Sequence, residues 1–325
     1  SLIRGVRLRI RARVRVRARR SLKHYYPEFN PMTQNLSRRS FLKGTAATAG
    51  ATTILVGSST RAQRQKVAFP QRVFGRTGQK VSTLALGTWP CGKSSEVDLD
   101  DIGRLIDESS KLGINFIDAA NNYGKAEEAI GIALEGRRKD FFLTSKVWAD
   151  TAEQAEASMS ESMKRLRTDY VDVMYIHSIG NRDVKKVMGS GGSLEYLLQK
   201  KKEGAIRHIG ISGHSMPDKF LPLIRTGKID VIMIAMNFVD RHTFGFETKV
   251  LPAALEQKMG VACMKVYGGM KGGFAAASGP NSGPMLPTTM KQLAVRYALG
   301  LPGVASCVIG PHTIDQLREN AKLVS

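Results

Sequence analysis

Short β-branched runs alternate with helix-length amphipathic segments from residue 71 onward, and this alternation constrains the fold more than any other feature. Parallel strands need crossovers long enough to hold a helix, so the pattern predicts a parallel α/β sheet. The strand candidates are Thr83–Leu86, Asn115–Asp118, Phe141–Lys146, Val171–Ile176, Ile206–Ser212, Val231–Ile234, Val261–Lys265 and Ala305–Ile309. Eight such units without a G-x-G-x-x-G opening favour a closed (β/α)8 TIM barrel over an open doubly wound sheet.

The segments between these strands carry helical signals. Asp98–Leu112 places Ile102, Leu105, Ile106 and Ser109 on one face, and Ala152–Leu166 does the same with Ala155, Met159, Met163 and Leu166. Glycines at 113, 204, 227 and 260 stand where helix C-caps are expected. Ahead of the first unit, RVFGRTGQKVS contains Gly75 and Gly78 between short apolar runs, which predicts a β-hairpin before the barrel.

Most of the net charge of +21 lies at the N-terminus. Residues 1–66 hold 16 Lys/Arg and one acidic residue, which leaves 33 basic and 27 acidic residues for the remainder. In residues 1–31 arginine alternates with small or apolar residues, as a nucleic-acid or membrane-surface arm could. We expect instead that translation begins at Met32 and that this tail is not translated. The body has no nucleic-acid-binding motif, so we expect no nucleic-acid partner.

Residues 32–62 read as an export signal. Paired arginines in SRRSFLK, at Ser37–Lys43, precede a short small-residue apolar run and then SSTRAQ. This order resembles a twin-arginine signal peptide, which implies the Tat translocation machinery as a partner and cleavage near Ala62. The apolar run is too short for a spanning helix, which needs about 20 residues. We therefore expect no stable membrane insertion, an exported periplasmic protein, a linker at 63–70 and a barrel at 71–325.

Polar residues recur where the predicted strands end, and the carboxyl ends of the strands carry the active site of a parallel barrel. Asp118, Lys146 and His177 end or follow three successive strands, and Tyr123 follows Asp118 by five residues. A lysine ammonium beside a phenol favours the phenolate and lowers a pKa that is otherwise about 10. Asp118 is the counter-charge for a buried Lys146. His177 could then orient a substrate oxygen that Tyr123 protonates.

The segments FIDAANNYG, TSKVW and YIHS resemble the signatures of the aldo-keto reductase family, and LALGTW and LAVRYALGLPGVASCVIG look similar to it as well. The resemblance spans roughly residues 72–324. It implies that Asp118, Tyr123, Lys146 and His177 form the catalytic tetrad. It further implies that Thr88 lies by the nicotinamide ribose, and that Trp89 and Trp148 line the substrate pocket.

The cofactor contacts depart from the usual family pattern. Ser212 is retained, but Gly213 follows it in place of Asn, and Met233 replaces a Gln. Lys265 stands where a stacking aromatic is usual, with Tyr267 two residues further on. Near the end, Gly310 and Gln316 stand where Lys and Arg often bind a 2′-phosphate. The resemblance implies Thr88, Ser212, Lys265, Gly310, Gln316 and Asn320 as cofactor-binding residues, with GGMKGG at 268–273 as a weak pyrophosphate loop.

These residues together predict an NAD(P)H-dependent oxidoreductase that interconverts a carbonyl (aldehyde, ketone or sugar) and an alcohol, with Tyr123 as general acid/base. The family favours NADP(H) slightly over NAD(H). The altered carboxamide contacts leave a second hypothesis, a non-catalytic nucleotide-binding or sensor protein on the same barrel. Cys91, Cys263 and Cys307 are widely spaced without a C-x-x-C pair. They predict neither a metal site nor a disulfide framework.

Overall fold

The computed structural model describes residues 69–324 except 239, 243–244 and 269–287. Within this part, eight parallel strands close in the order β10-β3-β4-β5-β6-β7-β8-β9. The pairing of β10 with β3 closes the barrel, which excludes the open sheet. The strands are β3 (Leu84–Gly87), β4 (Phe116–Asp118), β5 (Phe142–Val147), β6 (Val171–Ile176), β7 (Ile206–Gly213), β8 (Val231–Ala235), β9 (Gly260–Met264) and β10 (Val304–Ile309).

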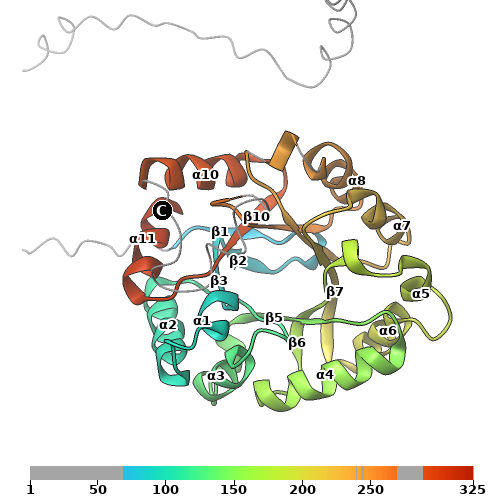
Figure 1. Ribbon diagram of the computed structural model, residues 1–325, viewed down its shortest axis with the longest axis horizontal. Coiled ribbons are helices and arrows are strands. Elements are labelled where there is room, and N and C mark those ends of the chain that lie inside the picture. Colours follow the sequence, from blue (N-terminus) through green and yellow to red (C-terminus); the bar gives the residue numbers. More distant parts are fainter. Residues whose placement is uncertain (1–68, 239, 243–244, 269–287, 325) are drawn as a thin grey trace, which may run out of the picture. The chain divides into compact units, whose positions relative to one another are not determined.

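Helices surround the barrel (Figure 1). Their bounds are α1 (Trp89–Lys93), α2 (Leu99–Leu112), α3 (Ala126–Ala133), α4 (Ala152–Leu166), α5 (Val184–Met188), α6 (Ser193–Glu203), α7 (Phe220–Arg225), α8 (Leu251–Glu256), α10 (Thr288–Gly300) and α11 (Ile314–Val324). Reciprocal capping boxes start α2 at Asp98 and α4 at Thr151, where each side chain accepts from the N3 amide. Gly113 and Gly204 end α2 and α6 in the left-handed conformation, as predicted.

Gly260 does not cap a helix, so that expectation is wrong. It is the first residue of β9, and a Cβ there would lie 2.8 Å from the ring of Phe74. The position needs glycine because of this approach. Lys258, with φ of 53°, takes the left-handed conformation two residues earlier.

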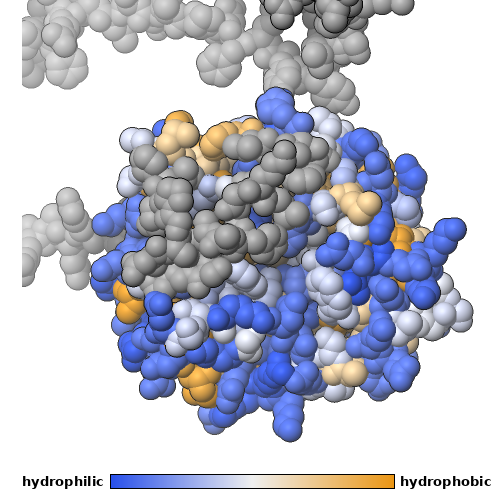
Figure 2. Space-filling model, in the orientation of Figure 1, coloured by the Kyte–Doolittle hydropathy of each residue, from blue (hydrophilic) through white to orange (hydrophobic). Residues whose placement is uncertain are grey.

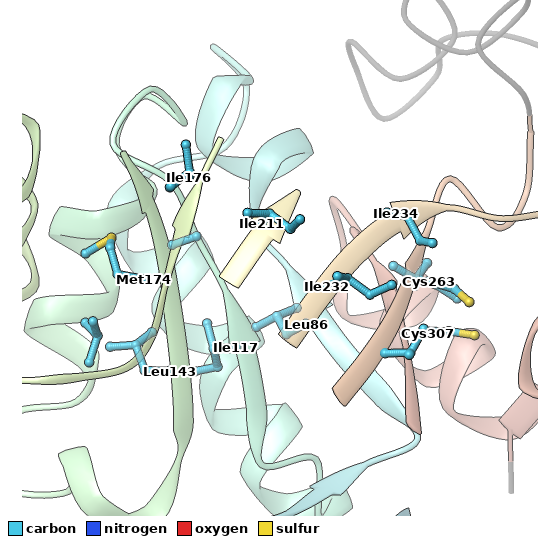
Figure 3. Close-up of a cluster of buried hydrophobic side chains, with 14 of the residues drawn as sticks. Leu86, Ile117, Leu143, Met174, Ile176, Ile211, Ile232, Ile234, Cys263 and Cys307 are labelled. Atoms are coloured by element: carbon cyan, nitrogen blue, oxygen red, sulfur yellow. The ribbon is translucent and has the colours of Figure 1, made fainter. Parts of the chain in front are cut away.

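Alternating strand residues divide the core into two layers. One layer fills the space between the strands and the helices and includes Leu86, Ile117, Leu143, Met174, Ile211, Ile232 and Cys263 (Figure 3). The other lies inside the barrel and includes Phe74, Val81, Ala85, Phe116, Phe142, Val173, Tyr175, Val231, Met233, Ala262 and Ala305. The three cysteines are buried free thiols.

The predicted hairpin is present as β1 (Gln71–Val73) and β2 (Lys80–Ser82), paired antiparallel. Phe74 follows β1 and packs inside the barrel, where the centroid of its ring lies 5.7 Å from those of the Phe116 and Phe142 rings. Arg72 donates to two backbone carbonyl oxygens at 2.7 Å, and Arg76 donates to three others. The hairpin therefore closes the amino-terminal end of the barrel and leaves the opposite end for the site.

The predicted tail at 1–31, the signal at 32–62 and most of the linker at 63–70 lie outside the described residues, as do residues 269–273 of the glycine-rich segment. No helix in the part of the chain that is described is long and apolar enough to cross a membrane. Figure 2 shows that the coloured surface of this face is mainly hydrophilic, with small separate apolar patches.

Candidate active site

A buried ion pair joins the carboxyl ends of β4 and β5. Strand register places Asp118 opposite Thr144, and Lys146 is the next residue of β5 on the same side. Lys146 Nζ donates to both carboxylate oxygens of Asp118, at 2.7 and 2.8 Å, and to the carbonyl oxygen of Ala119 at 2.6 Å. Thr144 Oγ1 donates to Asp118 at 2.9 Å. Both charged side chains are buried, so each charge is neutralised by the other and not by water.

Tyr123 lies on the loop between β4 and α3, next to the Lys146 ammonium. Lys146 Nζ is 4.6 Å from the centroid of the tyrosine ring. Burial raises the pKa of Tyr123 above its ordinary value of 10.0, and the charge of Lys146 acts in the opposite direction. The expected net lowering of this pKa is therefore wrong, because the burial effect is larger. The phenol is protonated at neutral pH and is able to donate.

His177 follows β6 directly and is buried. Its backbone N–H donates to the carbonyl oxygen of Val147 at 2.9 Å, which holds the residue against the end of β5. The imidazole lies edge-on to the rings of Tyr123 and Trp148, with centroids 6.0 and 5.3 Å apart. The structure therefore brings Asp118, Tyr123, Lys146 and His177 together with Trp148, as the sequence predicted.

The imidazole of His177 is neutral at pH 7. Burial holds its pKa well below the ordinary 6.5, and the charges of Lys146, His214 and Arg182 act in the same direction. A neutral imidazole keeps one N–H to donate, which suits a carbonyl oxygen.

Four of the residues expected to bind the cofactor lie around the ends of β3, β7, β9 and β10. Thr88 Oγ1 donates to the carbonyl oxygen of Asp118 at 2.8 Å. Ser212 Oγ accepts from the Ser178 amide at 3.3 Å. Lys265 has a φ of 57°, and its ammonium lies 5.3 Å from the ring centroid of Trp89. Gly310 follows β10, and a Cβ there would overlap the ring of Pro90.

The other two expected cofactor residues form a separate cluster on α11. Asn320 Oδ1 accepts from the Tyr267 hydroxyl at 2.7 Å, so Tyr267 faces the last helix. Gln316 Oε1 accepts from the His312 amide at 2.8 Å. The buried Nε2 atom of His312 has no hydrogen-bond partner among the described residues. This unpaired polar atom lies where the adenosine end of the cofactor is expected, and it suits a nucleotide that would supply a hydrogen-bond partner.

Two basic residues beside the tetrad were missed from the sequence. His214 follows β7, and burial with the charges of Lys265 and Lys146 lowers its pKa to about 4. Arg182 follows β6, and its guanidinium lies 4.2 Å from the ring centroid of Trp148. Neither belongs to a quoted motif. The only sequence signal was position, since both follow the carboxyl end of a strand closely.

One departure from the family pattern has a physical reason in the structure. A side chain at Gly213 would start 2.6 Å from Cζ of Phe220, so the asparagine of the family pattern does not fit beside this ring. Asn121, which follows β4, donates from its side-chain amide to the backbone carbonyl oxygen of Ser158 on α4 at 3.3 Å.

A closed parallel barrel with a lysine–carboxylate pair, a tyrosine and a neutral histidine at its open end defines a barrel enzyme able to act on a carbonyl group. The described residues contain no group of three His, Cys, Asp or Glu side chains placed to hold a metal ion.

Comparison with known proteins identifies the class. The sequence model of the aldo/keto reductase family matches residues 83–288, and that of the twin-arginine translocation pathway signal sequence matches residues 35–54. The chain belongs to the aldo/keto reductase family and carries a twin-arginine signal sequence. It is an oxidoreductase that interconverts carbonyl and alcohol with a nicotinamide cofactor.

Several relatives cover most of the barrel. L-galactose dehydrogenase from Arabidopsis thaliana is 28% identical over 78% of this chain and 88% of its own length. The uncharacterized oxidoreductase YqkF from Bacillus subtilis is 27% identical, over 77% of this chain and 89% of its own. The holo form of aldo-keto reductase AKR11C1 from Bacillus halodurans is 25% identical with a TM-score of 0.64, covering 79% of this chain and 91% of that chain.

Proposed function

We propose that Tyr123 is the general acid of carbonyl reduction and the general base of alcohol oxidation, with Lys146, Asp118 and His177 in supporting roles. The observation that carries this proposal is the buried Lys146–Asp118 pair, whose ammonium lies 4.6 Å from the centroid of the Tyr123 ring. An ammonium held there stabilises negative charge on the phenol oxygen when its proton leaves. Asp118 keeps Lys146 charged despite burial.

The residues divide the chemistry as follows. A nicotinamide cofactor, when bound, supplies or accepts the hydride at the substrate carbon. The N–H of neutral His177 donates to the carbonyl oxygen and orients it. Tyr123 transfers its proton to that oxygen as negative charge develops, and Lys146 stabilises the resulting phenolate. In the oxidation direction the same phenolate takes up the proton of the alcohol.

The cofactor we propose is NADP(H), bound with its nicotinamide near Thr88, Ser212 and Lys265 and its adenosine end near α11. The Nε2 atom of His312, which has no hydrogen-bond partner among the described residues, supports a 2′-phosphate, because an imidazole is able to donate to a phosphate oxygen. Titration with NADPH and with NADH, followed by tryptophan fluorescence of Trp89 and Trp148, tests this. Tighter binding of NADH would contradict it.

The substrate we propose is a small polar aldehyde, ketone or sugar. Asn122 and Asn181 are exposed on loops at the open end of the barrel, and Ser178 lies beside His177. These polar groups suit a hydroxylated substrate better than an apolar one. The relative named L-galactose dehydrogenase supports a sugar in particular.

We further propose that the signal is cleaved near Ala62 and that the mature enzyme, with residues 63–70 as a linker before the barrel, works in the periplasm. Twin-arginine systems export folded proteins, so the cofactor would be acquired before export and carried across. The nucleotide content of enzyme purified from the periplasm tests this. We expect about one nicotinamide nucleotide per chain. Periplasmic enzyme without bound nucleotide would contradict the proposal that the cofactor is exported with the enzyme.

The decisive test of the catalytic role is Tyr123→Phe. Removal of the hydroxyl group should reduce kcat by at least about 100-fold, because general acid catalysis contributes on that order. NADPH affinity should change little, because the phenol acts on the substrate. Tyr196→Phe, at a partly buried tyrosine on α6, is the matched control and should keep wild-type turnover. Wild-type turnover in Tyr123→Phe would refute the assignment.

A further inference from the structure

Arg182 is a buried cation without a hydrogen bond to its side chain in the part of the chain that is described. Its side chain is 9% exposed, and its nearest carboxylate is Asp150, with Nη1 and Oδ1 3.4 Å apart. Arg182 Nε and Asp150 Oδ1 both lack a hydrogen-bond partner among the described residues. Burial of a guanidinium with five donors is unfavourable unless acceptors surround it. Among the described residues only the Asp150 carboxylate lies close enough to pair with this charge.

Arg138, a structural arginine in the same chain, has a different set of hydrogen bonds. Arg138 is 14% exposed and donates to the carbonyl oxygens of Phe141 and Tyr170 and to the carboxylate of Asp172, at 2.8, 3.2 and 2.8 Å. Its Nε is also unbonded, but both terminal nitrogens have acceptors. Among the described residues Arg182 donates no such hydrogen bond, and its one ion pair is the 3.4 Å contact with Asp150. The difference therefore lies in the two terminal nitrogens, which are bonded in Arg138 and donate no hydrogen bond to a described residue in Arg182.

The position of Arg182 points to the substrate as that ligand. Its guanidinium lies 4.2 Å from the ring centroid of Trp148, and the centroid of the His177 ring lies 5.3 Å from that of Trp148. Trp148 remains 43% exposed, so part of its indole is open to a bound molecule. The charge of Arg182 also contributes to the low pKa of His177, after burial, Lys146 and His214. Arg182 and His177 therefore both contact the Trp148 ring, and His177 is the residue that would bind the carbonyl oxygen.

We propose that Arg182 binds a carboxylate of the substrate, so that the enzyme prefers carbonyl compounds that carry a carboxylate, such as semialdehydes and uronic acids. The carboxylate accepts from the guanidinium fork while the carbonyl oxygen accepts from His177, and the carbon chain lies along Trp148. A carboxylate suits this position better than a phosphate because Asp150 would repel a dianion more strongly. This inference rests on the proposed function.

Matched aldehydes of equal chain length test the proposal in the full-length holoenzyme. Succinic semialdehyde and butanal differ in the terminal carboxylate. Wild type should prefer the semialdehyde by at least about tenfold in kcat/KM, because only its carboxylate accepts charge-assisted hydrogen bonds from Arg182. Arg182→Met should abolish this preference mainly through KM, and Arg182→Lys should retain part of it. Lys185→Met, which removes an exposed charge on α5, is the control and should keep the preference.

Several outcomes would overturn the proposal. They are equal rates on both aldehydes in wild type, an equal loss for both in Arg182→Met, or a stronger preference for glyceraldehyde 3-phosphate over succinic semialdehyde. A structural role of Arg182 would produce the equal loss, because it would not distinguish the two substrates.

A binding measurement separates this proposal from the proposed function. Succinate should change Trp148 fluorescence in wild type and bind at least about tenfold more weakly to Arg182→Met, whether or not turnover occurs. If no aldehyde is reduced but succinate still binds through Arg182, the proposed function fails and the carboxylate site stands. If Arg182→Met does not fold, competition in wild type decides: succinate should inhibit butanal reduction competitively and butyramide should not. Equal inhibition by both would overturn the proposal.

Discussion

The ring of Tyr175 occupies the space that a side chain at Gly210 would need, because a Cβ built on Gly210 overlaps two carbon atoms of that ring. The two residues are register partners on β6 and β7, and Tyr175 is also the register partner of Lys146. Tyr175 is fully buried inside the barrel, and the Lys146 ammonium lies 6.0 Å from its ring centroid. The missing side chain at Gly210 thus makes room for the ring that lies beside Lys146.

Gly210→Ala should destabilise the protein by about 1–3 kcal/mol, because overpacking a filled core costs that much. Gly103→Ala is the matched control. Gly103 lies in α2, and a Cβ there meets nothing within 4 Å, so alanine should stabilise by about 0.5–1 kcal/mol. Urea unfolding of both variants checks the prediction. A destabilisation of Gly210→Ala no larger than that of a surface substitution would show that Tyr175 moves aside freely.

Lys146→Met should remove turnover and destabilise the fold by about 3–5 kcal/mol, because it leaves the carboxylate of Asp118 buried and uncompensated. Adding Asp118→Asn removes that charge and should recover stability without turnover. Urea unfolding and kcat measure the two effects separately. A Lys146→Met enzyme with the wild-type pH–rate profile would contradict the role of Lys146 in stabilising the Tyr123 phenolate.

Stability should fall as the pH drops below about 6.5, the ordinary histidine pKa in the unfolded chain. Burial holds the pKa of His177 well below 6.5 and that of His214 at about 4 in the folded protein. Above 6.5 both states are neutral at these residues and this stability is fully present. Between 6.5 and about 4 the unfolded state takes up the protons first, so the free energy of unfolding decreases.

Urea unfolding at several pH values from 7.5 to 4.5 measures this dependence. His214→Gln should flatten the slope because one of the histidines whose folded-state pKa is lowered no longer titrates. A slope equal to that of wild type would show that His214 does not contribute.

Replacement of Arg38 and Arg39 by lysine should retain the precursor in the cytoplasm, because the paired arginines identify the twin-arginine signal matched at residues 35–54. Fractionation and immunoblotting measure the amount in the periplasm. The matched control is Arg61→Lys with Arg64→Lys, which changes two arginines outside the matched segment. Unaltered periplasmic recovery of the first variant would contradict the twin-arginine assignment.

Much of the fold was predictable because the sequence signals are local. The predicted Val171–Ile176 strand and Ala152–Leu166 helix have the same bounds in the structure, and the predicted face of α2 is buried. The order of the strands in the barrel followed from the alternation of strands and helices. Because βαβ units are right-handed, few other strand orders are possible. The expectation for Gly260 failed because its glycine serves a contact with Phe74 that is 186 residues away in the sequence.

The sequence alone determined the barrel, the order of Asp118, Tyr123, Lys146 and His177, and the export signal, because these depend on periodicity, spacing and short motifs. Only the tertiary structure decided that burial outweighs Lys146 in the pKa of Tyr123, and that the guanidinium of Arg182 lies beside Trp148 with no hydrogen bond to any described residue. Desolvation and hydrogen-bond satisfaction depend on every group that packs around an atom. Those groups come from strands and loops far apart in the chain, and no local pattern records them.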